Sequence, residues 1–168
     1  MTTIAYKAGV MACDSCWTDA DLYDVAQTKI VRLASGALLG GSGDNDGREI
    51  EALLDKVKTA RQLPTRTQLA ALRSSFSGLL VLPSGAVFKV SAGYDEKPRD
   101  ADYGIWPSGR KGVAAAGSGA HLAIGAMAAG KSAREAVAIA CAWDIHSRLP
   151  VHALTLKPLR ARTSPRRR

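Results

Sequence analysis

The order of strand-like and helix-like patterns is the feature that most constrains the fold of this 168-residue chain. Apolar runs bounded by Gly and Ser turns predict strands over 3–7, 10–13, 29–33, 37–40, 79–82, 86–90, 113–116 and 151–156. Apolar residues at helical spacing predict helices over 48–60, 68–76, 120–129 and 132–146. Two antiparallel sheets with a helix pair on each outer face bury all these apolar faces. We therefore predict an α+β fold, a four-layer αββα sandwich.

Other segments predict turns, loops and helix ends. The stretch 18–28 is polar, and the stretch 95–111 is polar and rich in Pro and Gly, which predicts a long loop. The sequence Gly-Gly-Ser-Gly at 40–43 predicts a glycine-rich bend. Gly130 has the position of a helix C′ residue, and Ser132 with Glu135 has the pattern of a capping box.

The formal net charge of +8 is concentrated at the C-terminal end of the chain. The last twelve residues, 157–168, hold six Lys and Arg residues and no acid, which leaves 17 basic and 15 acidic residues elsewhere. We predict one domain over 1–156 and a basic, disordered tail over 157–168. We do not expect this tail to bind nucleic acid.

Neither a membrane span nor a metal site is expected. No apolar run reaches the roughly 18 residues of a transmembrane helix, and the start lacks the pattern of a signal peptide, so we predict a cytoplasmic protein. The three cysteines argue against a disulfide framework. Cys13 and Cys16 form a C-x-x-C pair without a second ligand pair, and His121, His146 and His152 do not share metal spacing.

The second residue of the chain, Thr2, is a candidate nucleophile. A small residue after Met1 lets the initiator methionine be removed, which would give Thr2 a free α-amine beside its hydroxyl. This pairing places a nucleophile and its base on one residue. Such a nucleophile needs a cation, a carboxylate that fixes the cation, and a backbone N–H for the oxyanion. Lys29, Asp14 and the bend at 40–43 offer these groups.

The sequence resembles the proteasome β-type peptidases, which are N-terminal nucleophile (Ntn) hydrolases, and in particular the bacterial HslV-type proteolytic subunit. The resemblance covers residues 2 to about 156, with the motifs in the order of the family. The matching segments are Thr2-Thr3-Ile4, 9–15 with Thr18, Thr28-Lys29-Ile30 with Leu33, 41–43, Gly117-Ser118-Gly119, 132–135 and 144–147.

This resemblance implies catalytic roles at named positions. Thr2 is the expected nucleophile, Lys29 the cation that lowers the pKa of its hydroxyl, and Asp14 the partner of Lys29. The remaining expected catalytic residues are Ser118, Asp144 and Ser147, which hold the Thr2 amine and position water, and Gly43, whose N–H receives the oxyanion. The expected substrate-binding residues are Thr18, through its backbone, Gly41 in the glycine-rich bend, and Trp17 and Val31, which flank a side-chain pocket.

The resemblance also implies partners. It implies a threonine-type endopeptidase that acts on unfolded polypeptides and assembles as a homo-oligomeric ring, stacked as a double ring, with an AAA+ ATPase unfoldase as a partner. It implies no metal or organic cofactor. One alternative is an inactive ring protein of the same fold, although Thr2, Lys29 and Asp14 are all retained.

A second alternative is a nucleotide-binding protein. Residues 125–132 match the phosphate-binding pattern G-x-x-x-x-G-K-[ST]. Twelve residues separate Ser132 from Asp144, too few for a helix and a return strand. We therefore expect residues 120–129 to form a helix that Gly130 ends.

Overall fold

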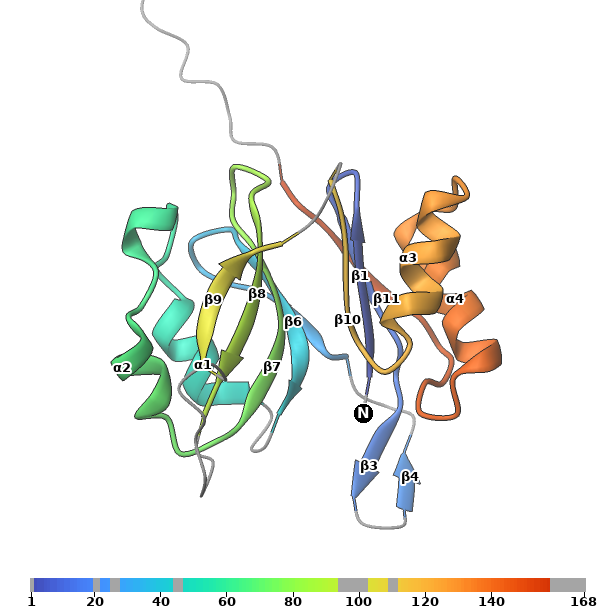
Figure 1. The fold of residues 1–168 in the computed structure, drawn as a ribbon, viewed down its shortest axis with the longest axis horizontal. Helices are drawn as coiled ribbons and strands as arrows, with labels where there is room; N and C mark the ends of the chain where they lie inside the picture. The colour runs from blue at the N-terminus through green and yellow to red at the C-terminus, as the bar shows by residue number, and fades with distance from the viewer. Residues whose placement is uncertain are drawn as a thin grey trace, which may run out of the picture.

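The protein forms four layers, with two sheets lying face to face between two groups of helices (Figure 1). This computed structural model describes residues 2–19, 22–24, 28–43, 47–93, 103–108 and 112–157. The predicted αββα sandwich is confirmed. Among the described residues, no helix is long and apolar enough to cross a membrane.

The first sheet contains the N-terminal strand at its centre. Its order is β10 (Val113–Gly117), β1 (Thr3–Lys7), β2 (Val10–Cys13) and β11 (His152–Thr155), all antiparallel. Helices α3 (Ala120–Ala128) and α4 (Ala133–Trp143) cover its outer face (Figure 1). The buried contact between this sheet and the helices is rich in alanine, so the helices approach the sheet closely. Its alanines are Ala5, Ala12, Ala115, Ala123, Ala133 and Ala136.

The second sheet has the order β5 (Ile30–Arg32), β6 (Leu38–Gly43), β7 (Phe76–Val81), β8 (Val87–Ala92) and β9 (Gly104–Pro107). Its outer face carries α1 (Arg48–Leu54), the 3-10 turn η2 (Ala60–Gln62) and α2 (Arg66–Ala70) (Figure 1). Between the two sheets lies an apolar core in which Ile4 and Met11 face Leu38 and Leu79. Burial of these side chains provides the main stabilisation of the sandwich.

The glycine-rich segment at 40–43 is a strand, so the predicted bend is wrong. It forms the last four residues of β6, which pairs with β7 from Leu38↔Val81 to Gly43↔Phe76. The glycines are needed because neighbouring groups leave no room for a side chain. A Cβ on Gly40 would lie 2.7 Å from Ile30 Cγ2, and one on Gly43 would overlap the carbonyl oxygen of Ser75.

Three further strands lie in segments that show no strand pattern in the sequence. Strand β9 lies within the predicted loop 95–111 and pairs with β8. The polar stretch 18–28 contributes to a separate hairpin of β3 (Trp17–Asp19) and β4 (Leu22–Asp24), which projects from one end of the sandwich (Figure 1). All three strands are short, and the longer segments that contain them are largely polar, so they show no strand pattern. The predicted basic tail lies outside the described residues from 158 onward.

Three helices, α1, α2 and α4, end earlier in the structure than their periodicity predicts. Helix α1 ends at Leu54, although Val57 is still buried beyond it, since a turn returns its N–H to the Leu54 carbonyl. Phe76 begins β7 and does not end a helix, because sheet pairing on both sides outweighs the local helical pattern. Helix α4 ends at Trp143 and not at His146.

The helical pair of the first sheet follows the predicted signals. Gly130 has a φ of 97° just beyond α3, and the side chains of Ser132 and Glu135 form the predicted capping box on α4. The segment 125–132 therefore starts within a helix and ends at the cap of the next one. It does not form a loop between a strand and a helix, so the phosphate-binding alternative is wrong.

Candidate active site

Sheet pairing brings the start of β1 and the end of β2 to the same end of the first sheet. Ile4 pairs with Cys13, so Thr2 and Thr3 lie beside Asp14, whose N–H donates to the Thr3 carbonyl at 3.2 Å. The Thr2 hydroxyl then donates to Asp14 Oδ1 at 2.7 Å. The candidate nucleophile and its predicted carboxylate are therefore in direct contact.

Asp14 is fully buried and is surrounded by hydrogen-bond donors. Buried carboxylates are stable only when paired and hydrogen-bonded. Three of the donors are backbone N–H groups, one from the adjoining turn and two from other parts of the chain. The donors are Thr2 Oγ1 (2.7 Å), Thr3 N (2.8 Å) and Lys29 Nζ (2.9 Å) on Oδ1, and Cys16 N (2.9 Å), Lys29 Nζ (3.0 Å) and Arg148 N (3.3 Å) on Oδ2.

Lys29 supplies the cation of this cluster. Its ammonium bridges both oxygens of Asp14, and its side chain is 5% exposed, so solvent screens the pair little. The lysine lies just before β5, where the Gly41 N–H donates to its carbonyl at 3.1 Å. The glycine segment of β6 thereby fixes the backbone from which the lysine side chain extends.

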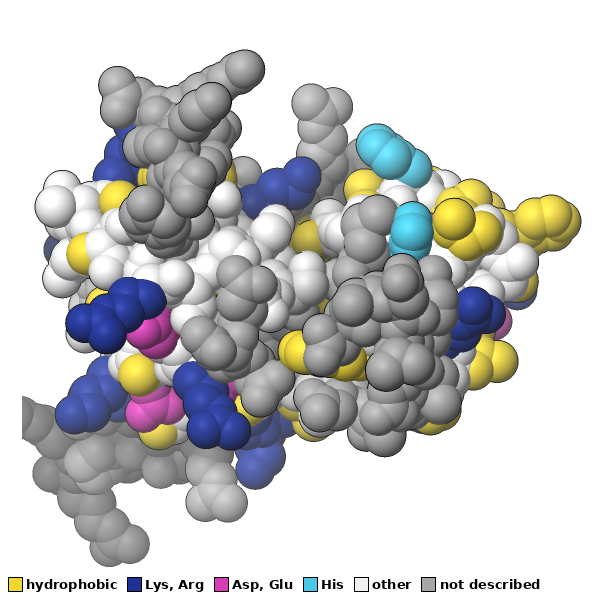
Figure 2. Space-filling model, turned by 90° about the horizontal axis from the view of Figure 1, so that it is seen from below, with side chains coloured by type: hydrophobic (Ala, Val, Ile, Leu, Met, Phe, Trp, Pro, Cys, Tyr) yellow, Lys and Arg dark blue, Asp and Glu magenta, His cyan; other side chains and the backbone are white. Residues whose placement is uncertain are grey.

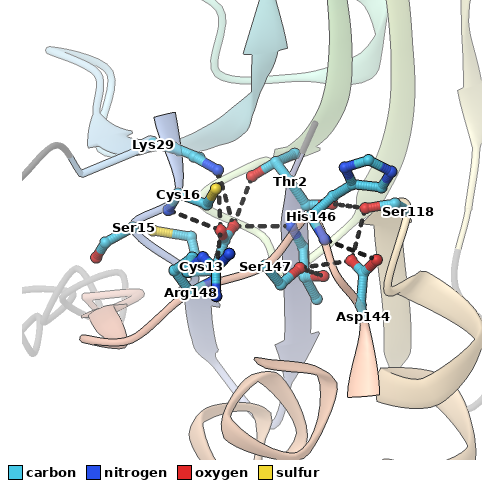
Figure 3. A network of polar contacts seen from close by, with 12 residues as sticks. Thr2, Cys13, Ser15, Cys16, Lys29, Ser118, Asp144, His146, Ser147 and Arg148 are labelled. Carbon is cyan, nitrogen blue, oxygen red and sulfur yellow. Dashed lines mark hydrogen bonds and ion pairs between the residues drawn. The ribbon is translucent and has the colours of Figure 1, made fainter. Parts of the chain in front are cut away.

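A second polar cluster lies on the other side of Thr2, at the end of α4 (Figure 3). Asp144 Oδ2 accepts from the hydroxyls of Ser118 and Ser147, each at 2.6 Å. Ser118 lies in the turn between β10 and α3, and its Oγ is also 3.3 Å from the Thr2 carbonyl oxygen. The structure thus brings Thr2, Ser118, Asp144 and Ser147 together, as the resemblance implies.

The position of Asp144 is unfavourable for the helix itself. It is the C-cap of α4, and a negative charge there opposes the helix dipole. Partial burial also raises its pKa, but hydrogen bonds from Ser118, Ser147 and the His146 N–H outweigh this and hold the pKa below the ordinary 3.8. A carboxylate kept ionised at the wrong end of a helix indicates a role beyond stability.

The turn that carries Ser118 requires glycine on both sides of it. Gly117 has a φ of 93°, and a Cβ there would overlap the Thr2 carbonyl. A Cβ on Gly119 would overlap Thr3 Oγ1 and lie 3.2 Å from Asp144 Oδ2. The glycines let the backbone around Ser118 approach β1 closely enough for the serine to reach Asp144.

The remaining predicted site residues lie around these clusters. Gly43 is the last residue of β6, and the N–H of Gly41 is occupied by Lys29. Val31 is half-buried against the core beneath α1 and α2. Trp17 is half-buried at the start of β3, and Thr18 pairs with Tyr23 there. Their roles in binding substrate stay predictions.

Sequence reasoning missed several groups that complete the site. The Thr3 hydroxyl lies 2.6 Å from Ser147 Oγ, and the N–H groups of Cys16 and Arg148 hold Asp14. Backbone donors carry no signal in the sequence, and nothing in the residue type of Thr3 distinguishes it from the neighbouring candidate nucleophile.

Cys13 and Cys141 are not activated nucleophiles. Burial raises the pKa of the Cys13 thiol, and it raises the pKa of Cys141 to about 11, so neither is a thiolate near neutral pH. Within the described part of the chain, no group of three or more His, Cys, Asp or Glu residues could hold a metal ion.

Comparison with known proteins identifies the fold. No protein-family model and no curated protein matches the sequence. Among solved structures, BPH from Thiobacillus denitrificans in complex with epoxomicin has 20% identity and a TM-score of 0.63, over 94% of this chain and 100% of its own. A second structure of this BPH has 21% identity and a TM-score of 0.60, over 94% of this chain and 98% of its own.

HslV from Trypanosoma brucei is similar to the same extent. It has 18% identity and a TM-score of 0.62, over 92% of this chain and 99% of its own length. Matches of this extent span almost every element of both chains, so they concern the whole sandwich. At these identities they show a common fold, and the chemistry must be argued from the site.

Proposed function

We propose that this chain, which shares its fold with BPH and HslV, is a threonine-type endopeptidase whose nucleophile is Thr2. The observation that carries the proposal is the contact of the Thr2 hydroxyl with the buried Asp14–Lys29 pair. A hydroxyl is a weak nucleophile unless a base removes its proton and a cation stabilises the resulting oxygen anion. Lys29 supplies such a cation, since its ammonium binds the same carboxylate oxygen as the Thr2 hydroxyl.

Removal of Met1 frees the base. The Thr2 amine, directly or through a water, takes the hydroxyl proton as Oγ1 attacks the carbonyl carbon of the substrate. A backbone N–H, assigned to Gly43, receives the oxyanion. The protonated amine then gives its proton to the leaving amine of the product, and an ester on Thr2 remains. Water hydrolyses this ester by the same groups acting in the opposite order, which restores the hydroxyl.

The cluster around Asp144 serves the amine in this scheme. A neighbouring carboxylate stabilises the protonated amine between the two proton transfers. Ser118 and Ser147 fix that carboxylate, because the hydroxyl of each donates a hydrogen bond to Asp144 Oδ2 at 2.6 Å. Ser118 also lies against the Thr2 carbonyl, which limits rotation of the nucleophilic residue.

The assembly state is part of the same proposal. Trp143, Ile145 and Leu149 are 78%, 74% and 61% exposed, and hydrophobic side chains gather at the end of the molecule that carries α3 and α4 (Figure 2). Large exposed apolar side chains of this kind are typical of interaction surfaces. They support association of the chain with other subunits. We propose that this assembly is a homo-oligomeric ring, stacked as a double ring and fed with unfolded polypeptide by an ATP-dependent unfoldase, as the family resemblance implies.

The test is covalent labelling of Thr2. A peptide epoxyketone offers two electrophilic centres, the ketone and the epoxide, which suit the hydroxyl and the amine of one N-terminal threonine. We expect intact-mass analysis to show loss of Met1 and addition of one probe per chain. Thr2→Ala should abolish the addition, whereas Thr2→Ser, which keeps a hydroxyl and an amine, should retain it.

Two outcomes would reject the proposal. Met1 could be fully retained, or Met1 could be lost while the chain neither reacts with the probe nor hydrolyses unfolded polypeptide. Rings that form without either activity would instead identify the inactive ring protein. Size measurement in solution, made on the same samples, separates that case from a protein that does not assemble.

A further inference from the structure

Thr3 connects the two polar clusters of the site. Its N–H donates to Asp14 Oδ1 at 2.8 Å, and its hydroxyl lies 2.6 Å from Ser147 Oγ. Asp14 and Ser147 belong to different clusters, at opposite ends of the chain. Thr3 is fully buried, so solvent does not compete for either contact.

The direction of the hydroxyl contacts follows from the number of hydrogens. Asp144 is ionised and can only accept hydrogen bonds, so Ser147 must donate its single hydroxyl hydrogen to Asp144 Oδ2. Ser147 Oγ is then the acceptor in the contact with Thr3, and Thr3 Oγ1 is the donor. The result is a one-way chain from Thr3 through Ser147 to Asp144, in which each bond polarises the next.

The peptide between Thr2 and Thr3 is held on both sides. Its N–H, which belongs to Thr3, binds Asp14, and its carbonyl, which belongs to Thr2, faces Ser118 Oγ at 3.3 Å. The orientation of the nucleophilic residue therefore depends on both clusters together. The Thr3 hydroxyl holds Ser147, which belongs to the cluster around Asp144.

We infer that Thr3 is a positioning residue of the catalytic site: its hydroxyl orients Ser147, and through Ser147 the Asp144 carboxylate that serves the Thr2 amine in the proposed mechanism. This inference rests on the proposed function and adds to it a residue that the family resemblance does not assign. Thr3 does not touch the substrate in this scheme. It acts on the rate of the chemical step and leaves substrate binding unchanged.

A buried threonine could instead serve packing alone, since its side chain lies against Gly119. The pair Thr3→Ser and Thr3→Ala separates the two roles. Both variants lose the same methyl group, and they differ only in the hydroxyl. We expect kcat for a peptide substrate, and the rate of epoxyketone labelling, to be about tenfold lower in Thr3→Ala than in Thr3→Ser. The KM values of the two variants should agree within a factor of about two.

The route through Ser147 is tested by a double-mutant cycle. In a Ser147→Ala background, Thr3→Ser and Thr3→Ala should react at the same rate, because the acceptor of the Thr3 hydroxyl is gone. Equal rates of the two variants in the native background, a difference confined to KM, or the same tenfold difference without Ser147 would each overturn the inference.

Two controls keep the result interpretable. Thermal melting is measured for each variant, and Thr3→Val, which fills the threonine volume without a hydroxyl, replaces Thr3→Ala if the latter melts below the assay temperature. The native chain is labelled in parallel. Failure of the native chain to label rejects the proposed function and this inference with it, whereas a labelled native chain with equal Thr3 variants rejects only the inference.

Discussion

Replacement of Asp14 by asparagine should destabilise the whole domain, although it changes a single atom. Asp14→Asn converts one carboxylate oxygen into an NH₂ group. Each oxygen currently accepts from three donors, at 2.7–2.9 Å on Oδ1 and at 2.9–3.3 Å on Oδ2. In either orientation of the amide, three buried donors would face another donor. The buried ammonium of Lys29 would also lose its carboxylate.

The magnitude follows from these losses. Breaking a buried ion pair by removing one partner costs about 3–5 kcal/mol, and the displaced backbone donors keep the cost in the upper part of that range. For a domain of this size, the melting temperature should fall by on the order of 10 °C. Urea unfolding followed by the fluorescence of the three tryptophans measures the change, at a fixed protomer concentration because assembly contributes to stability.

Two matched variants make the prediction specific. Thr2→Ala removes one donor from Asp14, so we expect it to cost roughly 1 kcal/mol. Lys29→Met removes the cation but leaves Asp14 with three backbone N–H donors and the Thr2 hydroxyl, so its cost should fall between the other two. All three should abolish labelling. An Asp14→Asn variant that loses less than about 1 kcal/mol would refute the view that this carboxylate holds the site together.

Two further predictions concern the second cluster. Gly117→Ala should abolish labelling, because its Cβ would overlap the Thr2 carbonyl at a φ of 93°. It should also destabilise the domain by more than about 1 kcal/mol, the cost of a strained left-handed residue. The control Gly85→Ala, at a φ of 86° with open space around it, should keep the activity. Since the folded-state pKa of Asp144 is lowered, its contribution to stability is complete above its ordinary value of 3.8 and is lost as the pH falls through the lower folded-state value. Acid titration of Asp144→Asn should therefore show a shallower loss of stability in that range than the native chain, and identical slopes would contradict the assigned hydrogen bonds.

The sequence predicts this fold where pattern and packing agree. The capping box of Ser132 and Glu135 and the turn at Gly130 fix the last helical pair locally, so both were predicted to within a few residues. Phe76 was assigned to a helix because its spacing from Leu69 and Leu72 is helical, whereas its pairing with Gly43 and Ala92 is visible only in three dimensions.

In the candidate site, too, the sequence shows some of the groups and only the folded structure shows the others. The side chains of Asp14, Lys29 and Asp144 could be singled out by residue type and family resemblance, and the structure brings them to Thr2. The backbone donors of Cys16 and Arg148 could not, because every residue but proline has an N–H and only the fold selects which ones converge. The roles of Gly43 and Val31 depend on a bound substrate and stay predictions.

The contribution of residues 144–148 to both clusters has a consequence for the synthesis of the protein. Arg148 supplies an N–H to Asp14, and Asp144 with Ser147 completes the surroundings of Thr2, so Asp14 awaits a donor that is synthesised 134 positions later. β11, which follows them, pairs with β2 and closes that side of the sheet. A growing chain therefore carries Thr2 with Asp14 and Lys29, but without Asp144 and Ser147, until those two residues have been synthesised. For a peptidase of this design, the order of synthesis would itself delay activity until a complete domain exists.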